Sequence, residues 1–200
     1  DGDASFDNQS VIIQGGTVAI DGAHTFKDVA VVTGGILTHS LATSTSAAPL
    51  AHITAGRFIV ARDGLVDISG KGYLGDCQPG RGCASGGGWE GDPNGGGAGR
   101  YAGGSHGGPG GHRGVDAALF GDFRAPTTAG GGGGYGNGGG EPGGNGGGRL
   151  RVTCDALVLH GAIRADGARP PRQSVDNGSG GAGGSVWITA DTWLGVGTIS

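Results

Sequence analysis

The side chains that could support catalysis or bind a metal are sparse and poorly grouped in this sequence. Of the 6 histidines, His106 and His112 stand closest together, among glycines, and no histidine lies in a helical metal-binding motif. Asp63 and Asp67 would form the paired carboxylates of a polysaccharide-cleaving enzyme if both faced outward. We interpret them instead as a turn aspartate and a solvated strand aspartate. The sequence therefore predicts no catalytic residue, no metal site and no cofactor.

Cys77 and Cys83 are candidates for a covalent link. They enclose the residues Gln-Pro-Gly-Arg-Gly, which favour a turn that brings the two sulfur atoms together. We expect a small-loop disulfide and hence an oxidising compartment, the alternative being two unpaired thiols. Cys154 lies in an apolar strand pattern and is expected to be buried and inert. An intermolecular disulfide through Cys154 is the other interpretation.

Composition and charge exclude several classes of partner. The net charge is −4, so the chain lacks the broad basic surface of a nucleic-acid-binding protein. No apolar run approaches the roughly 18 residues that a membrane-spanning helix needs, so no membrane insertion is expected. The chain begins at Asp1 without a signal peptide. We expect that a leader has been removed and that the protein is secreted or held at a cell surface.

The elements that would position any site come from a repeated pattern of strands and turns. Three copies begin at Leu50, Leu150 and Val186, and looser copies span residues 29–38 and 11–21. Each copy has three parts. The apolar residue followed by threonine is Ile53-Thr54, Val152-Thr153 or Ile188-Thr189, and the large residue is Phe58, Leu157 or Trp193. The closing segment is Ile68–Gly70, Ala165–Gly167 or Ile199–Ser200.

The copies are rich in Val, Ile, Thr and Leu and are interrupted by Gly, Asn and Asp, which is typical of short strands and turns. Strand-turn-strand units of about 20 residues that must stack to bury their apolar faces predict a β-solenoid. A β-sandwich is the alternative. We expect a single structural domain with N-terminal β coils at 1–69, a glycine-rich loop region at 70–148 packed on the solenoid, and C-terminal β coils at 149–200.

The chain contains 52 glycines, most of them between Gly70 and Gly148. Gly-Gly-x triplets begin at His106, Pro142 and Ser179. A polyproline II helix has three residues per turn and no internal hydrogen bonds, so neighbouring helices of this type could approach and pair their backbones. A flexible linker is the alternative. Against a linker stand Trp89, Tyr101 and Tyr135, which we expect either to anchor the glycine loops or to contact a partner. Residues 115–126 are expected to act as an apolar plug that pins these loops to the coils.

The strand repeats, the glycine triplets and the sequence Gly-Gly-Ser-Val-Trp-Ile-Thr-Ala that ends at Ala190 together resemble glycine-rich repeat segments of secreted and surface-anchored bacterial proteins. The triplets also look like the polyglycine II domains of phage tail-tip adhesins. This resemblance covers most of the chain. It implies an extracellular structural or adhesive role and brings no catalytic motif with it.

The outermost copies are expected to present strand edges that can pair with further strands. Val11, Ile12 and Ile13 lie at one end of the predicted stack, and Trp193 and Ile199 lie at the other. We expect head-to-tail association of a non-enzymatic protein into a surface fibre or adhesive filament. The alternatives are an adhesin module that binds a glycan or receptor, a β-helix enzyme that acts on a polysaccharide, and a fragment whose coils continue in a longer protein.

Overall fold

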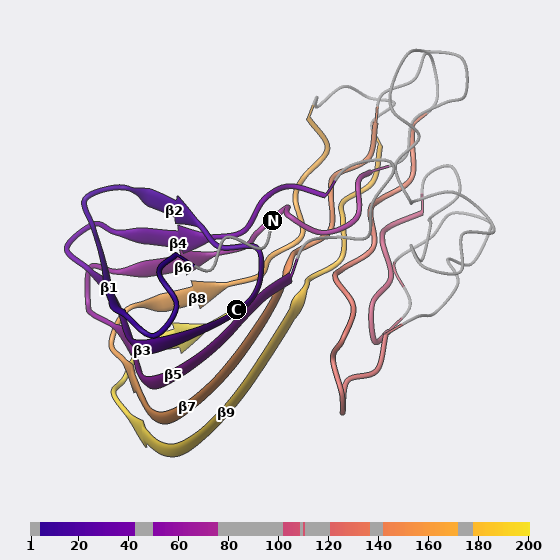
Figure 1. Cartoon of the computed structure of the whole chain (residues 1–200). Coiled ribbons are helices and arrows are strands. Elements are labelled where there is room, and N and C mark those ends of the chain that lie inside the picture. The colour runs from indigo at the N-terminus through magenta and orange to yellow at the C-terminus, as the bar shows by residue number, and fades with distance from the viewer. Residues whose placement is uncertain are drawn as a thin grey trace.

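The computed structural model describes residues 5–42, 50–75, 102–108, 110, 121–136, 142–171 and 178–200. Within these residues the fold is mainly β and contains no helix, which confirms the fold class at this level. Ten strands form two parallel sheets of five strands each. Figure 1 shows one sheet of long curved strands and a second sheet of short strands facing it.

Successive strands alternate between the two sheets. The long strands pair in the order β1-β3-β5-β7-β9, and the short strands pair in the order β2-β4-β6-β8-β10. Each repeat therefore adds one strand to each sheet. The long strands are β1(Ser10–Gln14), β3(Gly22–Val32), β5(Leu50–Val60), β7(Arg149–Leu159) and β9(Ser185–Leu194). The short strands are β2(Thr17–Ala19), β4(Ile36–Thr38), β6(Leu65–Asp67), β8(Ala162–Arg164) and β10(Thr198–Ile199).

The register between the long strands confirms the central part of the repeat alignment. Thr54 lies opposite Thr153, and Thr153 lies opposite Thr189. Phe58, Leu157 and Trp193 likewise occupy one position on three neighbouring strands. The copy expected to begin at Val29 in fact begins at Gly22, because the first half of β3 also pairs with β5.

The alignment of the closing residues of the last copy is wrong by two positions. Ile199 pairs with Ile163, which in turn pairs with Val66, and so Ile199 is not equivalent to Ala165 or Ile68. The turn lengths do not cause this error, because the same number of residues separates Leu157 from Ile163 and Trp193 from Ile199. The alignment matched Ile199-Ser200 to the similar pair Ile68-Ser69, which occupies a position two residues later in the repeat.

The core lies between the two sheets and continues from strand to strand. Val29, Phe58 and Leu157 share one inward position on the long strands and are fully buried. Val66 and Ile163 face them from the short strands and are also fully buried. Complete burial of a side chain of this size contributes about 1.5–3 kcal/mol. Stability therefore comes from stacking, since each apolar side chain packs on the equivalent residue of the next repeat.

Cys154 belongs to this core, which confirms the expectation that it is buried. Its residue is 6% exposed. Burial raises the pKa of the Cys154 thiol, and the neighbouring Asp155 raises it further, so the thiolate is disfavoured. The predicted disulfide between Cys77 and Cys83 lies outside the described residues.

β3, β5 and β7 each bend near the middle. In β5, Ala55 and Phe58 both point inward, so Gly56 and Arg57 between them both face outward. A Cβ atom on Gly56 would lie 2.9 Å from the carbonyl oxygen of Lys27, so the close approach of strands at the bend requires glycine here. At the neighbouring position of the bend, Arg57 of β5 donates from Nε to Asp28 Oδ1 of β3 over 2.8 Å and so links the two strands. The bend divides the outer face of this sheet into two halves.

Glycine-rich segments leave the ends of the short strands and return to the starts of the long ones, all on one side of the sheets (Figure 1). Their backbones bond directly to one another. Gly130 and Gly133 donate to Gly147 and Gly144, respectively, and the amides of Gly144 and Gly147 donate in turn to Ser179 and Ala182. The amides of Ser179 and Ala182 donate to Gly134 and Gly131, so each of the three segments bonds to the other two. The donors in each segment are three residues apart.

Side chains would prevent this contact between backbones. A Cβ atom on Gly146 would overlap the carbonyl group of Gly130, and one on Gly133 would overlap the carbonyl oxygen of Ser179. We name residues 129–136, 142–148 and 178–184 the glycine layer. Several of its backbone amides thus bond to carbonyl groups of neighbouring segments. The expected plug is wrong where it can be judged: Phe123 is 73% exposed and packs against no sheet, while residues 115–120 are not described.

Candidate assembly surfaces

The first surface lies at the β1 and β2 edge of the stack. Within the described chain, β1 pairs with β3 alone and β2 pairs with β4 alone, so the other edge of each strand is open. Large apolar side chains surround these edges: Phe6 is 66% exposed, Ile12 69% and Val18 40%. Exposed apolar side chains are ordinary when scattered, but a group of them beside open backbone edges is typical of an interaction surface.

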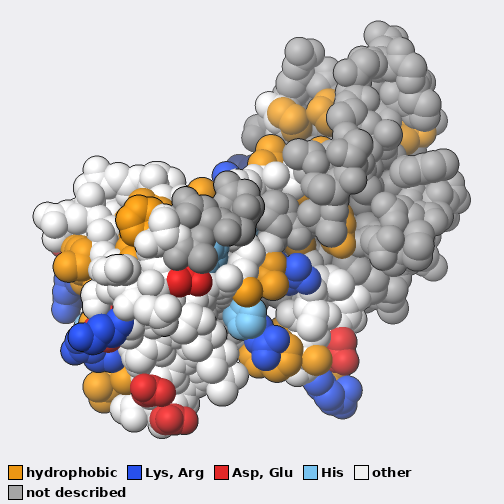
Figure 2. All heavy atoms as spheres, in the orientation of Figure 1, with side chains coloured by type: hydrophobic (Ala, Val, Ile, Leu, Met, Phe, Trp, Pro, Cys, Tyr) orange, Lys and Arg blue, Asp and Glu red, His pale blue; other side chains and the backbone are white. Residues whose placement is uncertain are grey.

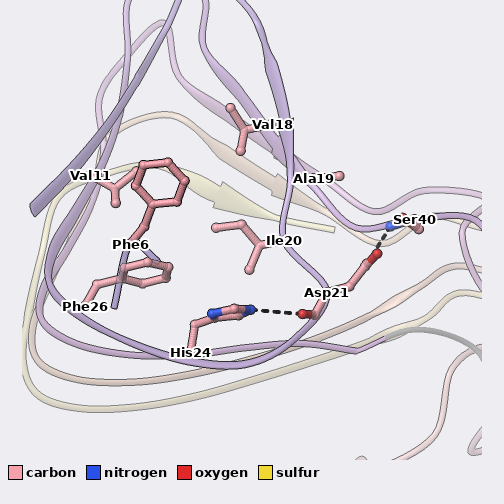
Figure 3. A pocket seen from close by; sticks show the side chains of 9 residues that line it. All are labelled: Phe6, Val11, Val18, Ala19, Ile20, Asp21, His24, Phe26 and Ser40. Carbon is pink, nitrogen blue, oxygen red and sulfur yellow. Dashed lines mark hydrogen bonds between the residues drawn. The ribbon is translucent and has the colours of Figure 1, made fainter. Parts of the chain in front are cut away.

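A cavity of about 500 Å³ opens between these two strands (Figure 3). Its walls are mainly apolar, because Val11 of β1, Phe26 of β3 and the flanking residues Phe6 and Ile20 surround it. The rings of His24 and Phe26 stack with their centroids 5.8 Å apart. On the β3 side it is lined by His24 and Phe26, which pair with Ile53 and Ala55 of β5. An apolar side chain of an added strand would fit it.

The polar groups at the rim of the cavity already bond to one another. His24 places Nδ1 3.0 Å from Asp7 Oδ1 and Nε2 3.0 Å from the carbonyl oxygen of Asp21. The amide of Ser40 donates to Asp21 Oδ1 over 2.8 Å. Burial alone would raise the pKa of Asp21, but the hydrogen bonds from Ser40 outweigh it and leave the pKa below its ordinary value. These hydrogen bonds fix the positions of the polar groups at the rim.

The second surface lies at the opposite end, on β9 and β10. Trp193 is 53% exposed, Leu194 58% and Ile199 45%, and Val196 in the turn between the strands is 82% exposed. The sequence identified Trp193 and Ile199 but missed Leu194 and Val196. Leu194 continues an outward apolar position shared with Ile59 and Val158, a signal that becomes visible once the register is known.

At the first end, the three predicted edge residues have different surroundings. Ile12 is exposed and points outward, as expected for an edge contact. Ile13 is 2% exposed and belongs to the core, so only its backbone is available at the edge. Val11 is half-buried, packs against the core and lines the cavity. Two of the three side chains thus lie between the sheets rather than outside them.

The predicted aromatic contacts are only partly described. Trp89 and Tyr101 lie outside the described residues. Tyr135 is half-buried within the segment 129–136 of the glycine layer, which agrees better with an anchor than with a free contact residue. The predicted partner role of these aromatic residues stays a prediction.

A buried histidine joins the sheets to the glycine layer. His39 has no exposed surface; its Nδ1 lies 2.7 Å from the carbonyl oxygen of Ser40, and its Nε2 accepts from the amide of Arg149 over 3.1 Å. This arrangement requires a neutral ring with its proton on Nδ1. Burial lowers the pKa of His39, and the hydrogen bond to Ser40 opposes the shift only in part. His39 therefore acts as a fixed connector.

Ser185 and His106 are close but are not arranged for catalysis. Ser185 Oγ lies 3.3 Å from His106 Nε2, yet it donates its proton to the carbonyl oxygen of Thr128 over 2.6 Å. Ser185 is 2% exposed, so no substrate carbonyl could reach its hydroxyl. Burial lowers the pKa of His106, against opposing hydrogen bonds to Thr128 and Gly183. The cluster stabilises the point where β9 meets the glycine layer.

The other candidate groups are also explained by local structure. Asp67 accepts the amide of Ser69 at Oδ1 over 3.0 Å, and the exposed Asp63 lies in the turn before β6. Among the described residues no cluster of three His, Cys, Asp or Glu side chains is placed to hold a metal ion. In the same part of the chain no helix is long and apolar enough to cross a membrane.

Figure 2 shows the basic and acidic side chains on the viewed face mostly separated by uncharged surface, without a large area of one sign. Comparisons with protein-family models, with curated protein sequences and with solved structures found no match to this chain.

Proposed function

We propose that the protein is a non-enzymatic structural protein of the extracellular space, a β-solenoid whose units stack end to end into a fibre. The alternation of strands between two parallel sheets supports the solenoid, because each repeat then forms one coil. The three-residue spacing of hydrogen bonds in the glycine layer supports polyglycine II packing, which has three residues per turn. The φ angles of Gly130, Gly144 and Gly147 lie outside the left-handed region, which is compatible with this kind of helix.

One observation carries the stacking proposal: the two open ends match when the existing register is continued. Position by position, Trp193 is equivalent to Phe58 and Val29, and Val29 pairs with Val11. A second copy placed on β9 in the same register would set its Val11 beside Trp193. By the same rule Ile12 meets Leu194, and Val18 meets Ile199. Apolar residues thus meet apolar residues in both sheets.

Stacking would satisfy the open edges and fill the cavity together. The backbone groups of β9 and β10 would gain the parallel partners that the inner strands already have. The indole of Trp193 would enter the space lined by Phe6, Val11 and Phe26 of the next copy. Such a contact is heterologous and does not close on itself, so repeated addition gives a filament.

The first experiment measures association by sedimentation velocity and electron microscopy over a range of protein concentrations. We expect concentration-dependent linear assemblies of the unaltered chain. Trp193→Glu should abolish them, since it places a charge in an apolar interface. Arg62→Gln changes the net charge by the same amount at an exposed turn in mid-stack and should leave assembly intact. A chain that stays monomeric at high concentration would contradict the proposal.

A second experiment tests the register itself. Continued pairing would put Ser10 of one copy opposite Thr192 of the next, at the Cα separation that a disulfide bridges. The double variant Ser10→Cys/Thr192→Cys should form ladders of covalent multimers on mild oxidation. Each single variant, and the shifted pair Ser10→Cys/Leu194→Cys, should form few. Filaments that cross-link equally well in the shifted pair would refute this register while leaving assembly standing.

A further inference from the structure

The flank of the long-strand sheet carries two regular ladders of side chains that neither core nor ends account for. Before the bend, Thr25, Thr54, Thr153 and Thr189 share one outward position. No hydroxyl of these four threonines bonds another residue in the described chain. Neighbouring strands are roughly 4.8 Å apart, so the hydroxyl groups form a row of donors and acceptors at that interval.

The second ladder is cationic and aromatic. Two residues before the threonines, Ala23, His52, Arg151 and Trp187 share an outward position. The Arg151 guanidinium carbon lies 4.6 Å from the centre of the Trp187 ring. Arg151 forms no ion pair with any described carboxylate, and none of the eight ladder residues is acidic. Burial, and next the charge of Arg151, lower the pKa of His52, which therefore stays neutral at pH 7.

A second aromatic–arginine pair extends from the same end of the strands. The segment before the glycine layer is held there because Arg149 donates to the carbonyl oxygen of Thr127 and Ser185 donates to that of Thr128. A few residues earlier, the Arg124 guanidinium lies 4.5 Å from the centre of the exposed Phe123 ring. Asp122 is the nearby acid, and its carboxylate accepts the Arg124 amide.

We propose that this flank binds an extended polysaccharide that carries carboxylate groups. Sugar rings have apolar faces that pack on aromatic rings such as Trp187, and their hydroxyl groups can bond to the threonine row. Arg151, which lacks a carboxylate partner within the described protein, would bind a uronate carboxylate, and Arg124 would bind a second one. The strand register fixes the spacing of Trp187, Arg151 and the threonine row, whereas Arg124 lies in the segment before the glycine layer.

The whole molecule makes this ligand a better fit than a nucleic acid. With a net charge of −4, the chain repels a polymer that bears a dense phosphate charge, whereas a polysaccharide presents fewer charges between its hydroxyl groups. The surface lies on the side of the stack, before the bend. Binding there is independent of the end-to-end association proposed above, and each can fail without the other.

Isothermal titration calorimetry with tetragalacturonate, at low ionic strength and per chain of protein, tests the proposal. We expect saturable binding that weakens with added salt, and much weaker binding of the neutral cellotetraose. Arg151→Gln should weaken tetragalacturonate binding about tenfold, the loss typical of one charged hydrogen bond. Arg164→Gln, the same change at an exposed residue of the other sheet, should have no effect.

Two further variants test the threonine row. Thr54→Val and Thr153→Val each remove one hydroxyl group while keeping the size and β-branching of the side chain, and each should weaken binding several-fold. Absence of saturable tetragalacturonate binding would overturn the proposal. Equal loss in the Arg151 and Arg164 variants would overturn it too, because the charge would then act without a defined site. Equal affinity for cellotetraose would overturn the requirement for carboxylate.

Discussion

At the scale of single residues, His39 shows how one side chain can couple two parts of a fold. Its ring donates to Ser40 and accepts from the Arg149 amide, at the position where the glycine layer becomes β7. Protonation would add a second donor at Nε2, facing an amide that can only donate. The junction therefore tolerates the neutral ring alone, and acid should weaken it.

The free energy of unfolding should fall as the pH drops below about 6.5. The folded chain lowers the pKa values of His39 and His106, so below this pH the unfolded chain binds more protons, and protonation favours unfolding. The contribution is complete above the unfolded pKa and is lost as the pH falls toward the folded one. Urea denaturation at several pH values measures it.

His39→Gln provides the matched variant for that measurement, because glutamine keeps one donor and one acceptor but does not titrate. Its stability should depend less on pH than that of the unaltered chain. His39→Leu should lose about 1–3 kcal/mol even at neutral pH, since the Arg149 amide would lack its acceptor. Identical pH profiles for His39→Gln and the unaltered protein would show that His39 is not the sensitive group.

At the scale of elements, the glycine layer replaces side-chain packing with contacts between backbones. The positions within it are not equivalent. A Cβ atom on Gly147 would overlap the carbonyl oxygen of Ala165, whereas one on Gly183 would lie 3.9 Å from the same oxygen, an ordinary contact. Neither residue has a positive φ. The two sites therefore differ only in the room that each leaves for a Cβ atom.

This contrast predicts opposite results for the same substitution. Gly147→Ala should destabilise the protein by at least about 1–3 kcal/mol, because backbone cannot move aside as a flexible side chain can. Gly183→Ala should be neutral or should stabilise by up to about 1 kcal/mol, because alanine reduces the freedom of the unfolded chain. Chemical denaturation of the two variants decides the matter. Equal losses would mean that the segments are not packed backbone against backbone.

The sequence allowed prediction of those elements whose residue types repeat. The alignment of Thr54 with Thr153 and of Phe58 with Leu157 was correct, because both the core and the outer face demand a similar residue from every strand. The first half of β3 was missed since Ala23 and His24 do not resemble His52 and Ile53. The position of Ile199 was misassigned because Ile199-Ser200 resembles Ile68-Ser69, although Ile199 aligns with Ile163 and Val66. The cavity and the ladders depend on the register between repeats and could not be predicted without it.

At the scale of the whole molecule, the sheets and the glycine layer should unfold together. The layer has almost no apolar contacts of its own, but its segments 142–148 and 178–184 run directly into β7 and β9. Gly148 donates to Ile68, and Ser185 donates to Gly148, so the hydrogen-bonded network passes from one part to the other without a break. The layer has no separate core on which to remain folded when the sheets open.

Hydrogen exchange with mass spectrometry provides the test. Peptides covering residues 129–136, 142–148 and 178–184 should exchange as slowly as peptides from β5 and β7, through one cooperative opening. Trp193→Glu, which acts at the distant edge, should leave this protection unchanged. Rapid exchange of the glycine peptides beside protected strands would show that the backbone bonds described for the layer do not persist in solution.

The spacing of donors in the glycine layer also limits how such a molecule can change in length over evolution. Gaining or losing a whole triplet in segment 142–148 would return every remaining amide to a carbonyl partner, merely lengthening or shortening the arm. In the polyglycine II helix proposed for this segment, a single added residue would rotate the remaining residues by a third of a turn and point their donors at empty space. Viable insertions and deletions in these arms should therefore come in multiples of three amino acids, a constraint that arises from helical phase rather than from the genetic code.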